Sequence, residues 1–150
     1  MYKRVLVPVD DSATSRRGLE EAMALAADQK AELRLLHVID LHAVMYASAD
    51  GTVLTESTMK AVRDAGRALL DTAQAKAATA GVPVTSALVE TAGGTVGETI
   101  VGQASDFKAD LIVMGTHGRR GVRRLLLGSD AASVASLAKV PVLLVRASES

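Results

Sequence analysis

Apolar residues along the chain follow two patterns, short continuous runs and spaced stripes, which predict strands that alternate with helices. Five runs are typical of strands: residues 4–9, 32–39, 83–89, 110–115 and 140–145. Several are apolar over nearly their whole length, as strands buried on both faces are. The pattern therefore predicts an α/β fold, an open parallel five-stranded sheet with helices on both faces.

Apolar stripes at helical spacing lie between the runs. Gly81 followed by Pro83 gives the second stripe a stop signal. From Asp40 to Ser57 no clean period is present, and so long a connection is unusual unless it is a functional loop or partly disordered. The four stripes consist of Leu19, Ala22, Met23 and Ala26; Met59, Val62, Leu69, Ala73 and Ala77; Val96, Ile100 and Ala104; and Ala131, Val134, Ala135 and Ala138.

Composition narrows the class of protein. A chain of 150 residues has the size of one domain, so we expect residues 1–150 to form a single unit. Its 17 basic and 17 acidic residues cancel, and only three residues are aromatic, which argues against nucleic-acid and membrane partners. The chain has no cysteine and no run of the ~20 apolar residues that a membrane span needs. We expect a cytoplasmic protein.

Several common catalytic motifs are absent. No Gly-Lys pair occurs, which excludes a P-loop, and the first strand-to-helix turn, VDDSATS, lacks the glycines of a dinucleotide fingerprint. Neither Gly-x-Ser-x-Gly nor His-Glu-x-x-His is present. Asp10 and Asp11 could suggest a response-regulator receiver, but the third strand ends at Glu90 and not at an aspartate.

The stretch VMGTHGRRGVRRLLLGSDA follows the fourth predicted strand and leads into a helix at about Ser129. Gly115 and Gly118 can adopt positive backbone angles, and successive amides in such a turn can bind an anion. Gly128 and Ser129 stand at the helix N-terminus, which also attracts anions. The expected ligand is a polyphosphate. Four arginines lie between these two sites: Arg119, Arg120, Arg123 and Arg124.

Each part of this loop also has a structural reading. The glycines could be turn residues, Ser129 a helix cap, and the arginines a solvated surface. Asp10 could be a helix-capping residue or an ordinary loop residue, although Ser12 and its neighbours are better candidates to cap the first helix. If the first and fourth strands are neighbours where the winding reverses, Asp10 faces the glycine loop across one crevice.

The chain resembles the universal stress protein family. The main match is Gly115-x2-Gly118-x9-Gly128-Ser129, the family's ATP-binding signature, and the segments RVLVPVDDS, LLHVID, ADLIVMGTHG and VPVLLVR extend it over nearly the whole chain. The resemblance implies a Rossmann-like sheet of the adenine nucleotide alpha hydrolase-like type, with strand order 3-2-1-4-5.

The resemblance also implies ATP as the ligand, with Mg²⁺ or Mn²⁺. Asp10 would meet the adenine or ribose, Val38 the adenine through its main chain, and Met114 with Gly115 the ribose-phosphate junction. The phosphates would lie against Gly118, Gly128 and Ser129. The full set of expected ATP contacts is Pro8, Val9, Asp10, Val38, Met114, Gly115, Gly118, Arg119, Gly128 and Ser129.

Two positions depart from the family pattern. Asp11 stands where the family commonly has glycine, which adds a carboxylate on the adenine side, and Asp130 replaces an apolar residue, which puts a carboxylate near the phosphates. Among the histidines, we expect His37 to pack in the core and His42 to lie in the long connection. Only His117, inside the glycine turn, is placed to touch a nucleotide.

The strand from Val140 to Val145 is an edge strand in the implied order and has no charge to protect it. The family pairs this strand across a twofold axis, which implies a homodimer. Three functions remain open: a regulatory ATP binder with at most slow hydrolysis, an ATPase or phosphotransferase using Asp10 or Asp11 and a metal, and a nucleotide-free dimeric scaffold.

Overall fold

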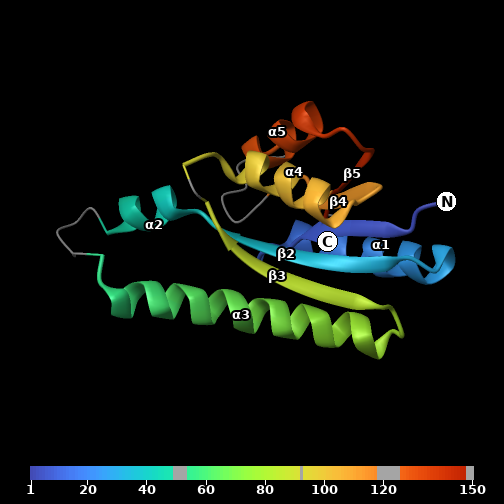
Figure 1. Ribbon diagram of the computed structural model, residues 1–150, viewed down its shortest axis with the longest axis horizontal. Helices are drawn as coiled ribbons and strands as arrows, with labels where there is room; N and C mark the ends of the chain where they lie inside the picture. The colour runs from blue at the N-terminus through green and yellow to red at the C-terminus, as the bar shows by residue number, and fades with distance from the viewer. Residues whose placement is uncertain (49–53, 92, 118–125, 148–150) are drawn as a thin grey trace.

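The computed structural model describes residues 1–48, 54–91, 93–117 and 126–147. Five parallel strands form one sheet in the order β3-β2-β1-β4-β5 (Figure 1). The predicted fold class and strand order are therefore confirmed. The strands are β1 (Arg4–Pro8), β2 (Glu32–Ile39), β3 (Val84–Glu90), β4 (Leu111–Gly115) and β5 (Val142–Val145).

Helices cover both faces of the sheet. On one face, the core joins α1 and α3 to Val5, Val7 and Leu35; on the other, it joins α4 and α5 to Leu6 and Leu36. These strand residues are fully buried on both faces, which accounts for the continuous apolar runs in the sequence. The helices are α1 (Ala13–Gln29), α2 (Leu41–Ala47), α3 (Glu56–Thr79), α4 (Val96–Phe107) and α5 (Ser129–Leu137).

Local capping and turn residues mark the ends of these helices. Ser12 caps α1 by accepting a hydrogen bond from the Ser15 amide, and Thr95 forms a capping box with Glu98 at the start of α4. After α3, Gly81 has a φ of 76°, a left-handed angle that suits glycine. In the part of the chain that the structure describes, no helix is long and apolar enough to cross a membrane.

The long connection after β2 was interpreted wrongly as lacking regular structure. It contains α2, which Asp40 caps by accepting hydrogen bonds from the amides of His42 and Ala43 through Oδ1. This helix has seven residues and none of them is buried, so it leaves no apolar period in the sequence. Two stripe residues were also misplaced: Leu70 is buried where Leu69 was expected, and Ala135 is exposed.

Candidate functional site

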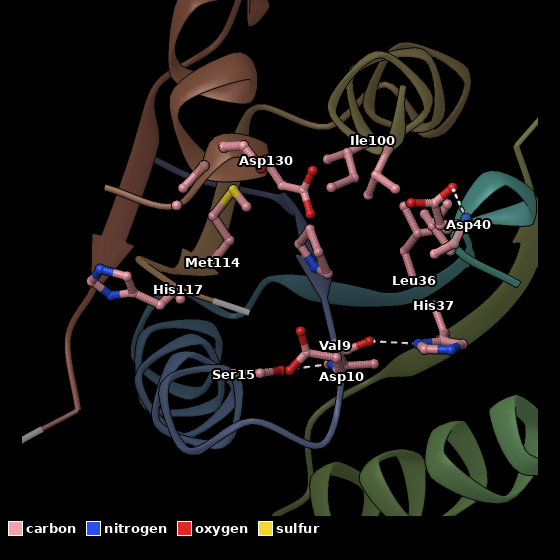
Figure 2. Close-up of a pocket in the computed structure, with 18 of the residues that line it drawn as sticks. Val9, Asp10, Ser15, Leu36, His37, Asp40, Ile100, Met114, His117 and Asp130 are labelled. Carbon is pink, nitrogen blue, oxygen red and sulfur yellow. Dashed lines mark hydrogen bonds between the residues drawn. The ribbon is translucent and has the colours of Figure 1, made fainter. Parts of the chain in front are cut away.

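A pocket of about 580 Å³ lies at the carboxyl ends of β1, β2 and β4 (Figure 2). In open parallel sheets, ligands bind at the carboxyl ends of the strands, next to the strand at which the strand order reverses. Here β1 is that strand, with β2 on one side and β4 on the other. Eight predicted site residues line the pocket: Pro8, Val9, Asp10, Val38, Met114, Gly115, Gly128 and Ser129. Gly118 and Arg119 lie outside the described residues.

The turn after β1 fixes Asp10 at the pocket wall. Its Oδ1 accepts a hydrogen bond from the Ser12 amide at 2.8 Å, and its own amide donates to Ser15 Oγ at 2.9 Å (Figure 2). Ser15 is buried, so this anchor belongs to the protein interior. Asp11 is exposed and does not line the pocket, so of the paired aspartates only Asp10 reaches it.

Gly115 is required for packing and not, as expected, for a positive backbone angle. Its φ lies outside the left-handed region, which among the described glycines only Gly81 and Gly93 occupy. A Cβ on Gly115 would lie 2.7 Å from Thr14 Oγ1 and 2.8 Å from the Thr14 carbonyl carbon. The hydroxyl of Thr14 in turn donates to the main-chain oxygen of His117. The first turn, which contains Asp10, and the start of the glycine loop are thus next to each other, as expected if they face one crevice.

Gly128 connects the end of the glycine loop to the residue that follows β4. Its amide donates to Thr116 O at 2.8 Å, and a Cβ there would lie 2.9 Å from the same oxygen. The amide of Gly128 is therefore engaged with the protein and does not offer a free donor. Gly128 caps α5 without a side-chain hydrogen bond, and amides in the first turn of a helix lack acceptors within the helix. The donors that could bind an anion at this end are therefore the amides of the turn that begins at Ser129.

Backbone groups of Val38 face the pocket because β1 ends early. Leu36 O accepts from Val9 N on the β1 side at 2.8 Å, and strand residues two apart direct their backbone groups to the same side. Val38 therefore points its N–H and C=O toward β1, whose register with β2 ends at Pro8 opposite Leu36. One residue thus offers a donor and an acceptor side by side at the pocket wall.

The apolar end of the pocket was not predicted from the sequence. Side chains from β2, α2, α3 and α4 line it, and apart from those of β2 they come from segments that carry no motif. The signal that could have located them is topological, because every one lies near the carboxyl end of a strand or in a helix packed beside one. They are Leu36, Ile39, Ala43, Val44, Val62, Val96 and Ile100.

Two histidines line the pocket, and each is held by the protein. His37, expected as a core residue, is half-buried, and its Nδ1 lies 2.8 Å from Val9 O. For His117, Nδ1 lies 3.0 Å from Thr116 Oγ1 and Nε2 is bonded to Leu126 O. His117 therefore lines the pocket, with both ring nitrogens bonded to the loop itself, and His37 lines it too, although only His117 was expected there.

The charges of the described lining are acidic. Asp10, Asp40 and Asp130 contribute carboxylates, and the side chain of Asp130 extends from the start of α5 toward the pocket (Figure 2). No lysine or arginine is among the described lining residues, and the loop arginines lie outside the described ranges. Within those ranges no three His, Asp or Glu side chains gather as a metal site. The residues present therefore fit a divalent cation only if a ligand supplies most of its oxygens, as phosphates do for Mg²⁺.

An ion pair fixes α3 beside the apolar end. Arg63 Nε lies 2.5 Å from Glu90 Oε1, which joins α3 to the last residue of β3. The hydrogen bond from Arg63 lowers the pKa of Glu90, and the same bond raises the pKa of Arg63. Both groups are thus charged at neutral pH, and Val62, which lines the pocket, is held in place next to Arg63.

Comparison with known proteins identifies the family. The model of the universal stress protein family matches residues 1–146. This chain belongs to the universal stress protein family. It is 33% identical to the universal stress protein YxiE of Bacillus subtilis over 97% of this chain and all of that protein. The solved structure of MJ0577 from Methanocaldococcus jannaschii matches with a TM-score of 0.84 and 28% identity, covering 100% of this chain and 99% of the other.

A second solved structure of the family is described as a universal stress protein in complex with cAMP. It matches with a TM-score of 0.67 and 29% identity, and covers 98% of each chain. A relative with the same fold has thus been crystallised with a nucleotide.

The close contact at Gly115 predicts a specific loss of stability. Gly115→Ala forces the new methyl group into Thr14, so we expect unfolding free energy to fall by about 1–3 kcal/mol. Gly102→Ala is the matched control, because Gly102 lies inside α4 with nothing within 4 Å of an added Cβ. That change should raise stability by roughly 0.5–1 kcal/mol. Urea unfolding measures both, and an equal response of the two variants would contradict the packing role of Gly115.

Proposed function

We propose that this universal stress protein is a cytoplasmic regulatory protein that binds ATP in the pocket at the carboxyl ends of β1, β2 and β4. The observation that carries the proposal is the convergence of Asp10, Val38, Met114 and Ser129, which are far apart in the sequence, on one pocket. Its volume of about 580 Å³ is in the range of small-molecule sites. The relative crystallised with cAMP supports an adenine nucleotide as the class of ligand.

At the base end, the main chain of Val38 suits adenine. The Watson–Crick edge of adenine carries an acceptor, N1, beside an amino donor, N6, and Val38 offers an N–H beside a C=O. Guanine presents a carbonyl acceptor and an N–H donor in the reverse order, so it would set donor against donor. The half-buried carboxylate of Asp10 is available through Oδ2 for a ribose hydroxyl.

At the phosphate end, the first turn of α5 suits an anion. Its amides lack acceptors within the helix and stand at the positive end of the helix dipole. Asp130 opposes this attraction with its own charge, so the phosphates should bind together with Mg²⁺ or Mn²⁺. The cation would neutralise charge at the phosphates. We further propose that Gly118 and Arg119 complete this end.

Regulation by occupancy is favoured over rapid turnover. Of the two aspartates that could serve an ATPase or phosphotransferase, only Asp10 lines the pocket, and one of its oxygens is already bonded to the Ser12 amide. A nucleotide-free scaffold is the other alternative. The pocket has an apolar end, and the N–H and C=O of Val38 both face it. These features favour ligand binding over a scaffold that binds no nucleotide.

Binding measurements with two nucleotides test the proposal. By isothermal titration calorimetry with Mg²⁺ present, ATP should bind roughly 10- to 100-fold more tightly than GTP, because guanine leaves the groups of Val38 unpaired. Gly128→Val should abolish ATP binding, since its side chain would displace Thr116 and the start of α5. Gly102→Ala serves as the control and should bind ATP as the wild type does. Absence of heat with ATP and Mg²⁺ in the wild type would refute the proposal.

We also propose a homodimer that pairs the β5 strands of two copies. β5 is an edge strand of the sheet, and Leu143 on it keeps 40% of its surface exposed. An edge without charge favours pairing with another strand. Pairing of two identical edges across a twofold axis gives a closed dimer.

A charge at the β5 edge should separate the proposed dimer. Leu143→Lys in both copies places two like charges on one face of the joined sheet beside the paired strands, so sedimentation velocity should show a monomer. Ser86→Lys introduces the same charge on β3, at the opposite edge of the sheet, and should leave a dimer. A wild-type protein that sediments as a monomer at micromolar concentration, or two variants that behave alike, would contradict β5 pairing.

A further inference from the structure

His37 connects the pocket to α3 in a way that no motif indicates. It lies on β2, lines the pocket, and directs Nδ1 to Val9 O at 2.8 Å (Figure 2). The other edge of its ring lies against α3 at Gly66, where an added Cβ would be 2.9 Å from His37 Cδ2. The imidazole therefore fills the space between the pocket wall and the helix without room to rotate freely.

The bond to Val9 replaces a missing strand pairing. Val9 lies one residue beyond the last register pair of β1 and β2, and its amide donates to Leu36 O at 2.8 Å. With His37 bonded to its carbonyl, both backbone groups of Val9 are held by β2. A carbonyl only accepts hydrogen bonds, so His37 Nδ1 must carry a proton. The bond thus fixes the ring tautomer as well as the peptide between Val9 and Asp10.

We infer that His37 is a positioning residue that sets the place of Asp10 in the pocket by holding the Val9 carbonyl. Asp10 follows Val9 directly, and it is further restrained by the hydrogen bond of its amide to Ser15 Oγ and by that of its carboxylate to the Ser12 amide. Without the imidazole, the Val9–Asp10 peptide loses its side-chain anchor to β2 and keeps only its anchors to the first turn, so the position of the carboxylate shifts. For nucleotide affinity this inference rests on the proposed function.

The contact with Gly66 extends the effect to α3. A methyl group at Gly66 would collide with His37 Cδ2 and with Leu88 Cδ1, at 2.9 and 2.8 Å. Because the ring has no free space on that side, Gly66→Ala must shift either the helix or the imidazole. A residue of α3 that never touches the ligand thereby influences the position of Asp10.

The first test uses the protein without ligand. Long-range ¹H–¹⁵N NMR spectra of the imidazole should show His37 protonated at Nδ1. The amide shifts of Asp10, Asp11 and Ser12 should move in His37→Leu and return toward wild type in His37→Asn, whose amide nitrogen stands at the same distance from Cα as Nδ1. Protonation at Nε2 alone, or shifts that do not follow the loss and return of the donor, would overturn the inference.

The second test measures ATP affinity by calorimetry. His37→Leu should bind ATP roughly three- to tenfold more weakly, the loss expected for one hydrogen bond, and His37→Asn should recover most of it. Leu33→Val is the control for general destabilisation, because Leu33 lies on the same strand and face but away from the pocket. Its affinity should equal that of the wild type.

A double-mutant cycle separates positioning from general structural support. Losses from His37→Leu and Asp10→Asn should be strongly non-additive, because both act through one carboxylate, whereas His37→Leu and Ser129→Ala should be additive. Additive losses in the first pair, or weakening by Leu33→Val equal to that by His37→Leu, would overturn the inference. If the wild type binds no ATP, the proposed function fails, and the spectra of the free protein still decide the role of His37.

Discussion

The early end of β1 beside the longer strand β2 is the constraint on which the site depends. Along β1, Val9 directs its amide to β2, so Pro8 faces β4. Proline has no N–H to donate, and the register between β1 and β4 ends at Leu6 and Ile112. A proline in a central strand is normally unfavourable, but here its missing donor coincides with the opening of the pocket. The same ending leaves Val38 without a pairing partner on the β1 side.

Close backbone packing then shapes the rest of the pocket. Gly115 admits Thr14 of α1, and Gly128 admits the main chain of Thr116, so two glycines of the family signature bring segments together. Hydroxyl groups complete the connection, since Thr14 donates to His117 O. In this chain these glycines are better explained by contacts within the protein than by unusual backbone angles. They place the first turn of α5 across from Asp10, which is what a nucleotide spanning the pocket would need.

The sheet could be predicted from the sequence, because strands buried on both faces leave continuous apolar runs. Much of the pocket lining could be predicted too, because it follows the ends of these strands. Prediction from the sequence failed at α2, whose seven residues bury nothing and therefore carry no period. It could not assign His37, because its role depends on the end of β1 and on Gly66 of α3, both distant in the sequence. It also gave Gly115 a backbone role, since packing against Thr14 is visible only in three dimensions.

The most direct test of a nucleotide lying across this edge of the sheet is an NMR titration of the ¹⁵N-labelled protein with ATP and Mg²⁺. The account predicts that the amides of Val38 and of the turn from Ser129 to Ala131 shift together and saturate at one nucleotide per chain. Saturating shifts confined to residues away from the carboxyl ends of β1, β2 and β4 would contradict it.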